Sequence, residues 1–251
     1  MKTLNYLFGL LSVFYFNLAY AMPSEFVYLK DIDPSILQDI RYAGYHNAMG
    51  KPSRGYNAPE CILTRDTASA LSKIQAKLKQ SNYTLKVYDC YRPEMAVQEF
   101  MTWSLNLNDQ KMKAEFYPKV DKENLFADGY FAEKSGHSRG STVDITIVKL
   151  PAATEPKYQP GDKLVSCFAP YRKRYRDNGI DMGVGFDCFD PRSNYHHKMS
   201  IGVHKNRLLL RTIMQEAGFV PYNKEIWHFT LRDEPFPEKY FNFPIQPKSK
   251  I

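Results

Sequence analysis

A histidine and an aspartate lie seven positions apart in the segment Ser135–Asp144, which reads SGHSRGSTVD. Its two glycines indicate a loop that presents His137, and Asp144 lies where an apolar, β-branched run begins. A buried aspartate is costly unless another group compensates its charge, and a metal ion would do so. The alternative is an aspartate that hydrogen-bonds the preceding loop, and this segment alone favours neither interpretation.

A second histidine lies in the aromatic, β-prone segment Glu225–Thr230, which reads EIWHFT. In such a run His228 is expected to point toward a core or a cleft, and a histidine satisfied within the core is the more common case. The nearby Glu225 favours a catalytic role for this segment over a histidine buried in the core. Side chains alternate along a regular strand, so residues three apart would face opposite sides. A glutamate in the turn before the strand could instead reach the same cleft as His228.

Two histidines and one carboxylate are the typical protein ligands of a catalytic zinc site, which keeps a fourth position open for water. His137, Asp144 and His228 would supply those ligands. Glu225 would then remain as the general base that takes a proton from water and returns it to the leaving amine. The spacing differs from the helical H-E-x-x-H pattern, because the second histidine comes from a distant segment.

An arginine in the segment Tyr88–Pro93, which reads YDCYRP, is a further candidate. Arg92 is expected at the end of a strand, just before a helix that Pro93 can open, and this position would let it face a cleft. Its charge persists at any working pH and could stabilise the oxyanion that forms when water attacks a peptide carbonyl. A structural ion pair is the more common role of a lone arginine.

Hydrophobic periodicity predicts the elements that would position these residues. The predicted strands are 84–89, 143–148 and 226–231, and the predicted helices are 66–80, one that Pro93 opens, and 206–217, which Gly218 ends. Residues 150–163 contain three prolines and are expected to form a loop. Helices and strands do not alternate regularly, so we expect an α+β fold. The expected architecture is a single domain with a mostly antiparallel central sheet, flanking helices and the zinc site in a central cleft.

The N-terminal residues 1–21 have the features of a secretory signal peptide. Lys2 precedes an apolar run that ends in Ala19-Tyr20-Ala21. The run is shorter than the roughly 20 apolar residues that a membrane-spanning helix needs. We therefore expect cleavage after Ala21 and export to the periplasm or the medium, with residues 22–251 forming one domain.

Four cysteines remain in the mature chain, and none of them belongs to a C-x-x-C pair, which disfavours a structural zinc knuckle. An even number of cysteines in an exported protein suggests disulfides. Proximity in the sequence favours the pairs Cys61–Cys90 and Cys167–Cys188, although four cysteines allow three pairings and the sequence does not choose between them.

The formal net charge of +7 could indicate a nucleic-acid partner, but the basic residues are scattered. The densest run is Arg172-Lys173-Arg174, and no basic stripe with interleaved aromatic residues is present. We therefore expect no nucleic-acid partner and no stable membrane insertion. The expected surface is solvated, with some attraction to an anionic wall or membrane.

Taken together, these segments resemble the VanX-type D-alanyl-D-alanine dipeptidases, within the wider group of zinc D,D-peptidases. The S-x-H-x-x-G-x-x-x-D pattern occupies Ser135–Asp144, the E-x-W-H pattern occupies Glu225–His228, and the Y-R-P turn is 91–93. Asp181-Met182-Gly183, followed by Phe186-Asp187, resembles the substrate-side loop of this family. The resemblance extends from about residue 26 to residue 231, in the expected order and spacing.

The resemblance implies a D,D-dipeptidase domain over 22–251 that binds one Zn²⁺ and hydrolyses D-alanyl-D-alanine to two D-alanines in cell-wall peptide turnover. It implies zinc ligands His137, Asp144 and His228. It also implies Glu225 as general base and acid, Arg92 as a donor to the transition state, and Ser135 and Asp181 as pocket residues.

Two other functions fit the same residues. A D,D-carboxypeptidase or endopeptidase acting on peptidoglycan stems would share the metal centre and have a more open cleft. Thr142 stands where many zinc D,D-carboxypeptidases have alanine, which favours the dipeptidase subgroup. A zinc-containing wall-binding module without activity would need no base, so Glu225 counts against it.

Overall fold

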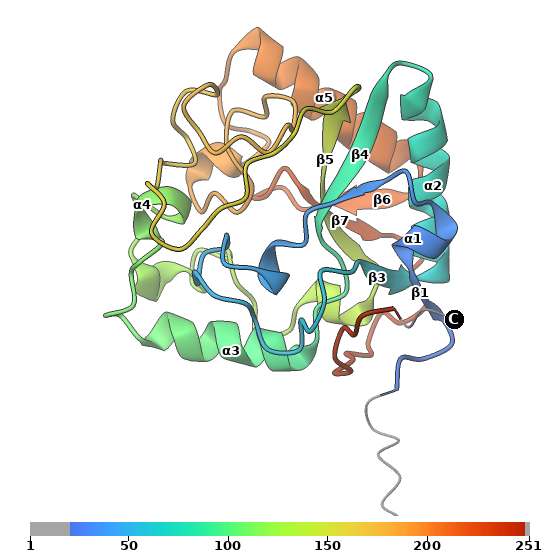
Figure 1. Cartoon of the computed structure of the whole chain (residues 1–251), viewed down its shortest axis with the longest axis horizontal. Helices are drawn as coiled ribbons and strands as arrows, with labels where there is room; N and C mark the ends of the chain where they lie inside the picture. The colour runs from blue at the N-terminus through green and yellow to red at the C-terminus, as the bar shows by residue number, and fades with distance from the viewer. Residues whose placement is uncertain (1–20, 249–251) are drawn as a thin grey trace, which may run out of the picture.

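A computed structural model describes residues 21–248, so the predicted signal peptide lies outside the described residues except for its last position. The chain folds into a central sheet with helices and long loops around it (Figure 1). The strands are β1 Phe26–Tyr28, β2 Leu37–Gln38, β3 Ile62–Thr64, β4 Tyr83–Asp89, β5 Thr142–Lys149, β6 Phe219–Pro221 and β7 His228–Leu231. The α-helices are α1 Leu29–Ile32, α2 Arg65–Lys79, α3 Glu94–Leu105, α4 Lys113–Phe116 and α5 Ile201–Glu216.

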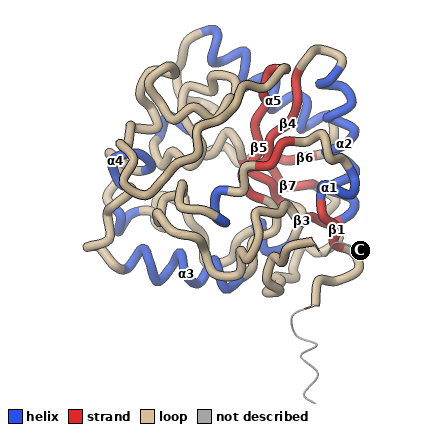
Figure 2. Tube along the Cα trace, viewed as in Figure 1, coloured by secondary structure: helices blue, strands red, loops and turns tan. Residues whose placement is uncertain are grey.

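The main sheet has five strands in the order β2-β4-β5-β7-β6. Only β2 and β4 run parallel, while the other neighbouring strands run antiparallel. A separate antiparallel pair joins β1 and β3. Helices α2 and α3 lie on opposite sides of the strands in the view of Figure 1, and Figure 2 shows how much of the remaining chain is loop. The predicted α+β fold with a mostly antiparallel central sheet is confirmed.

Two predicted elements have different boundaries in the structure. Helix α5 begins at Ile201, five residues before the predicted start, because the Ser200 hydroxyl accepts a hydrogen bond from the backbone N–H of Val203 and caps the helix there. Strand β7 begins at His228 and not at residue 226, because a turn occupies the preceding residues. The other predicted helices and strands agree with the structure, and 150–163 is a loop.

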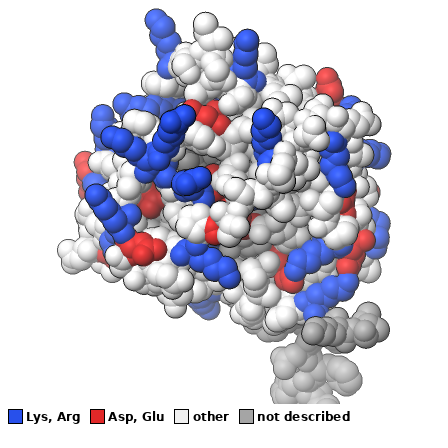
Figure 3. Space-filling model, turned by 45° about the horizontal axis from the view of Figure 1, so that its top comes forward, with Lys and Arg blue, Asp and Glu red and all other residues white. Residues whose placement is uncertain are grey.

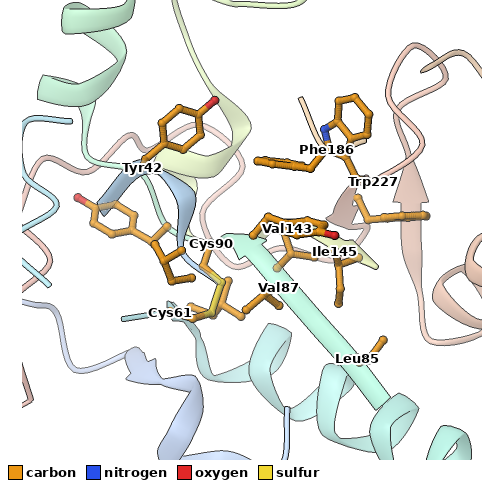
Figure 4. Packing of buried hydrophobic residues seen from close by; sticks show 14 of the residues in the cluster. Tyr42, Cys61, Leu85, Val87, Cys90, Val143, Ile145, Phe186 and Trp227 are labelled. Atoms are coloured by element: carbon orange, nitrogen blue, oxygen red, sulfur yellow. A yellow bond between two sulfur atoms is a disulfide. The ribbon is translucent and has the colours of Figure 1, made fainter. Parts of the chain in front are cut away.

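The two central strands are covered on both faces, which makes them rigid supports for a site. Leu85 and Val87 of β4 and Ile145 of β5 are fully buried, and Phe186 and Trp227 pack near them (Figure 4). Each fully buried side chain of this size contributes about 1.5–3 kcal/mol to folding. Close packing of this kind fixes the ends of β4 and β5, where the candidate site residues lie.

All four cysteines are paired in disulfides, Cys61 with Cys90 and Cys167 with Cys188. The pairing that sequence proximity favoured is therefore confirmed. Figure 4 shows the first disulfide beside the end of β4, among buried apolar side chains. Both bonds close loops of moderate length, which constrains the unfolded chain and stabilises the fold.

Thiol titration of the purified protein under denaturing, non-reducing conditions is expected to find no free thiol, because every cysteine has a partner. After reduction the same titration should count four thiols per chain. Finding four free thiols before reduction would contradict the pairing.

Two surface properties complete the description. No helix within residues 21–248 is both long and apolar enough to cross a membrane. Lys and Arg side chains are spread over the face shown in Figure 3, with Asp and Glu side chains between them.

Candidate metal centre and substrate pocket

Three side chains with metal-binding atoms converge at one end of the central strands. His137 lies in a short 3₁₀ helix, Gly136–Arg139, while Asp144 lies in β5 and His228 opens β7. Asp144 and His228 are directly opposite in the β5–β7 pairing, which brings their side chains together. One ligand atom from each of the three residues lies within 4.8 Å of the other two.

Local interactions of Ser135 and Gly140 fix the loop that carries His137. The Ser135 hydroxyl accepts a hydrogen bond from the backbone N–H of His137 at 3.3 Å and caps the 3₁₀ helix. Gly140 ends this helix at φ +82°, and a Cβ atom there would lie 2.2 Å from the ring of Phe26. Glycine is therefore required at position 140, and this sharp end returns the chain to β5.

Two buried atoms in this cluster lack hydrogen-bond partners among the described residues. His137 Nδ1 lies 2.8 Å from the carbonyl oxygen of Cys90 and donates to it, which leaves Nε2 as the unprotonated nitrogen, 3.4 Å from Asp144 Oδ1. Both Nε2 and Oδ1 are unpartnered, and His228 Nδ1 lies 3.2 Å from the same oxygen. A cation between the three atoms would satisfy them, and the two nitrogens and one oxygen form a donor set typical of zinc.

The charges at this cluster favour metal binding. Burial alone would raise the pKa of Asp144, but the neighbouring His137 and His228 hold it well below its ordinary value. Burial lowers the pKa of His228, although Asp144 opposes that shift. An ionised carboxylate and a neutral imidazole are the forms in which Asp144 and His228 would bind a metal ion.

Glu225 lies in the turn between β6 and β7, the position from which it can share the cleft with His228. Its backbone N–H donates to the carbonyl of Tyr222 at 3.1 Å, and its own carbonyl accepts from His228 N–H at 3.2 Å. This turn brings Glu225 Oε2 to 3.5 Å from His228 Nδ1. Burial, and next the negative charge of Asp144, raise the pKa of Glu225 well above its ordinary value. A raised carboxyl pKa suits a group that both accepts and returns a proton.

Arg92 lies between β4 and α3 and is held in place by Asp89. The Arg92 Nε and Nη2 atoms lie 2.9 Å and 2.7 Å from Asp89 Oδ2, and Nη2 lies 3.8 Å from Asp144 Oδ2. Asp89 is fully buried and accepts a further hydrogen bond from Tyr56 at 2.7 Å. Arg92 thus forms a structural ion pair with Asp89 and also lies beside the candidate metal ligands. A structural ion pair and a role as donor to an oxyanion, the two interpretations of this arginine, are therefore compatible.

These residues surround a cavity of about 260 Å³. It is lined by the three candidate metal ligands, Arg92, Ser135, Asp187 and Glu225, with aromatic side chains from Tyr42, Tyr130, Phe131, Phe189 and Tyr222. Its size suits a small molecule, and its charged lining suits one that is itself charged.

Asp181 is the one predicted site residue that the structure does not bring to this cavity. Its carboxylate accepts from the backbone N–H of Gly183 at 2.8 Å and pairs with Arg174. Asp187 lines the cavity instead, where it accepts a hydrogen bond from the Tyr42 hydroxyl at 2.6 Å. The sequence contains a signal that distinguishes the two aspartates. Asp181 belongs to an Asp-x-Gly sequence, which is typical of a turn, whereas Asp187 interrupts an apolar run, where a charged side chain is costly to bury without a partner.

Asp89 and Tyr42 had no role in the sequence interpretation, and Asp187 was named only as part of the segment that resembles a substrate-side loop. Asp89 was part of the quoted YDCYRP segment, but its partnership with Arg92 depends on the way the chain turns after β4. Tyr42 comes from the N-terminal quarter of the chain, far in sequence from the other site residues, and no motif marks it.

Comparison with known proteins identifies the family. A family model described as D-ala-D-ala dipeptidase matches residues 22–155 and 167–246. The D-alanyl-D-alanine dipeptidase of Enterococcus faecium is 34% identical, covering 90% of this chain and 100% of that protein. Those of Streptomyces coelicolor and Escherichia coli K12 are 34% and 30% identical, over 89% and 83% of this chain and 100% and 85% of theirs.

A solved structure of the vancomycin-resistance D,D-dipeptidase VanXYg, in complex with a D-Ala-D-Ala phosphinate analogue, gives a looser match. The TM-score is 0.33 at 15% identity, over 84% of this chain and 67% of that chain. From the family match over most of its length, this chain belongs to the D-Ala-D-Ala dipeptidase family of M15 peptidases and is a metallopeptidase.

Proposed function

We propose that this protein is a zinc-dependent dipeptidase that hydrolyses D-alanyl-D-alanine to two molecules of D-alanine. The observation that carries the proposal is the convergence of His137, Asp144, His228 and a buried Glu225 on one small cavity. Family membership supports the substrate, because the curated relatives share this activity in name and match most of this chain.

His137, Asp144 and His228 would hold one Zn²⁺ ion per chain, because their facing nitrogen and oxygen atoms fit that ion. When bound, zinc supplies a Lewis acid that polarises the peptide carbonyl and lowers the pKa of water. The hydrogen bond from His137 to the Cys90 carbonyl fixes the imidazole tautomer and its orientation toward the ion.

Glu225 would move the protons. Buried beside the metal-binding residues, it would accept a proton from the attacking water and deliver it to the nitrogen of the leaving D-alanine. Arg92 would donate hydrogen bonds to the carbonyl oxygen as negative charge develops there. The ion pair with Asp89 keeps the guanidinium in position, so little reorganisation is needed during the reaction.

Asp187 would bind the ammonium group of the dipeptide. Burial, and next the negative charge of Asp144, raise the pKa of Asp187 to about 7. A cation placed beside its carboxyl group would favour the ionised form, and the free amino end of a dipeptide is such a cation. Asp187 and Ser135 both line the cavity, whereas Asp181, the other residue expected in the pocket, does not.

One side of the cavity is closed by contacts between two segments, which favours a dipeptide over a longer stem. The Tyr222 hydroxyl donates to the carbonyl of Gly129 at 3.0 Å, and Lys224 Nζ contacts the carbonyl of Asp128. Both Gly129 and Tyr222 line the cavity. A longer stem that left the cavity past Gly129 and Tyr222 would have to break this contact.

A substrate panel tests the proposed activity. Zinc-loaded protein is expected to release D-alanine from D-Ala-D-Ala, and to leave L-Ala-L-Ala and a pentapeptide ending in D-Ala-D-Ala uncleaved. Preferential release of D-alanine from the pentapeptide would favour the carboxypeptidase instead. Zinc binding without cleavage of any of the three peptides would favour a binding module.

Replacing Arg92 with alanine is expected to lower kcat for D-Ala-D-Ala by roughly 10²–10³-fold, the usual cost of losing one donor to an oxyanion. KM should change much less, because the donor acts mainly in the transition state. Steady-state kinetics measure both constants. Arg192→Ala is the control, because Arg192 pairs with Asp190 and does not line the cavity. A large rise in KM at unchanged kcat would make Arg92 a substrate anchor.

We also propose that the mature protein is exported after cleavage at Ala21 and acts in turnover of cell-wall peptides. Two disulfides support an oxidising compartment. The N-terminal pattern supports a signal peptide. N-terminal sequencing of the protein recovered from the periplasm or medium tests this, with residue 22 expected first.

A further inference from the structure

Asp187 holds its carboxyl group in the cavity from an unfavourable backbone conformation. Its φ angle is +53°, in the left-handed region, and the residue is buried. Glycine adopts this region freely, whereas an aspartate does so at an energetic cost. Such a conformation persists where the surrounding structure holds it in place.

Regular secondary structure does not provide that support. Residues 150–190 contain no helix or strand, and their only described β contact is an isolated bridge between Gly179 and Val148. A loop this long in a folded domain needs other contacts to give it one shape.

A disulfide lies next to Asp187 in this loop. Cys188 follows Asp187 directly and is bonded to Cys167, and both cysteines are buried. The Cys167 carbonyl accepts from Gly185 N–H at 2.7 Å, and the Cys167 N–H donates to the carbonyl of Glu115 in α4 at 3.0 Å. The cross-link therefore ties the chain on both sides of Asp187 to a helix of the fold.

The other disulfide lies beside a different part of the cavity lining. Cys90 lies two residues before Arg92, and its carbonyl accepts the hydrogen bond from His137 Nδ1 at 2.8 Å. The bond to Cys61 ties this segment to the residue just before β3 (Figure 4). Each disulfide is thus adjacent to a different part of the site.

We propose that Cys167 and Cys188 are positioning residues, whose disulfide sets the affinity for the substrate by holding Asp187 in its left-handed conformation. The Cys61–Cys90 disulfide instead supports the wall that carries His137 and Arg92. This inference rests on the proposed function, in which Asp187 binds the substrate ammonium.

Kinetics of the double variant Cys167→Ala/Cys188→Ala test the proposal. KM for D-Ala-D-Ala is expected to rise roughly 10–100-fold, the cost of a weakened charged hydrogen bond, while kcat and zinc content change little. The matched variant Cys61→Ala/Cys90→Ala is expected to show the opposite pattern, with a lower kcat or weaker zinc binding and a smaller change in KM. Equal effects of both variants on both constants would mean general destabilisation and would overturn the proposal.

A mutant cycle with Asp187→Asn determines whether the disulfide acts through Asp187. Asparagine adopts the left-handed region about as readily as aspartate but lacks the negative charge. If the disulfide acts through the carboxylate, adding Asp187→Asn to Cys167→Ala/Cys188→Ala raises KM little further. Fully multiplicative effects would mean that the disulfide and the carboxylate act independently, which contradicts the proposal.

Amide hydrogen exchange provides a readout that needs no activity. Exchange in residues 183–189 is expected to quicken in Cys167→Ala/Cys188→Ala and to stay unchanged in Cys61→Ala/Cys90→Ala. Unchanged exchange in the first variant would overturn the positioning role even if the protein proved to cleave another substrate. Should a double variant fail to fold, stepwise reduction of the wild-type protein with mass mapping of each disulfide makes the same comparison.

Discussion

Replacing Glu225 with glutamine is expected to leave zinc and the fold in place while nearly all hydrolysis of D-Ala-D-Ala is lost. Glutamine keeps the shape and hydrogen-bonding capacity of the side chain, so the lost property is proton transfer. Water would still be activated by the metal, but the leaving nitrogen would receive no proton from position 225. Loss of general acid–base catalysis costs roughly 10²–10⁴-fold, and the two proton transfers assigned to Glu225 place this variant near the upper limit.

The comparison needs metal content as well as rate. Zinc analysis and D-alanine release are measured on Glu225→Gln and on Glu216→Gln, an exposed glutamate at the end of α5 that serves as control. Zinc retained with activity lost agrees with a proton-transfer role. Zinc lost together with activity would make Glu225 a fourth ligand of a closed structural site.

Replacing His137 with alanine is expected to reduce bound zinc from about one ion per chain to almost none, and to abolish hydrolysis. The imidazole supplies one of the three convergent donors, and its unpartnered Nε2 faces Asp144. His204→Ala is the control, because His204 lies exposed on α5. Metal analysis by mass spectrometry and D-alanine release measure the two effects.

Loss of zinc should also change stability. An ion that binds only the folded state stabilises it by mass action, so removing zinc from the wild-type protein should lower its Tm. His137→Ala should show little further decrease on chelation, because it has little zinc to lose. Wild-type zinc content in both His137→Ala and His228→Ala would show that the metal site has been assigned to the wrong residues.

The sequence predicts the elements that have strong periodicity or clear boundaries. The helix over 66–80 and the strands over 84–89 and 143–148 are found within a residue or two, because apolar spacing determines which face is buried. Short strands such as β2 and β6 have too few residues for a pattern to emerge. Their pairing depends on neighbours that are distant in the sequence.

The local hydrophobic pattern of the sequence also does not reveal which charged side chains are buried. Lys86 lies in the middle of β4 and reads as a solvent-facing position, yet it is buried and pairs with Glu155 at 3.0 Å. Its partner comes from the proline-containing loop after β5, which has no periodicity to predict its path. The same loop region carries Asp187, so its place in the cavity could not be derived from spacing either.

The three candidate metal ligands could be predicted from the sequence because each lies in or near a predictable strand. Asp144 belongs to β5 and His228 to β7, and pairing of these strands places the two side chains opposite each other. Predicting that Glu225 shares the cleft with His228 required one further condition, a turn before β7, and the structure has that turn. Asp187, the proposed substrate-binding residue, lies on a long loop that has no strand pairing around it and contains the Cys167–Cys188 disulfide.

Reconstitution of hydrolysis with zinc tests the proposed dipeptidase activity most directly. The protein is treated with a chelator and dialysed, and D-alanine release from D-Ala-D-Ala is followed as zinc is added back. We predict almost no release from the metal-free protein and full recovery at about one equivalent of zinc, because one three-ligand site is present in the described chain. Undiminished release without metal, or no release from protein carrying one zinc ion, would contradict a zinc-dependent D-Ala-D-Ala dipeptidase.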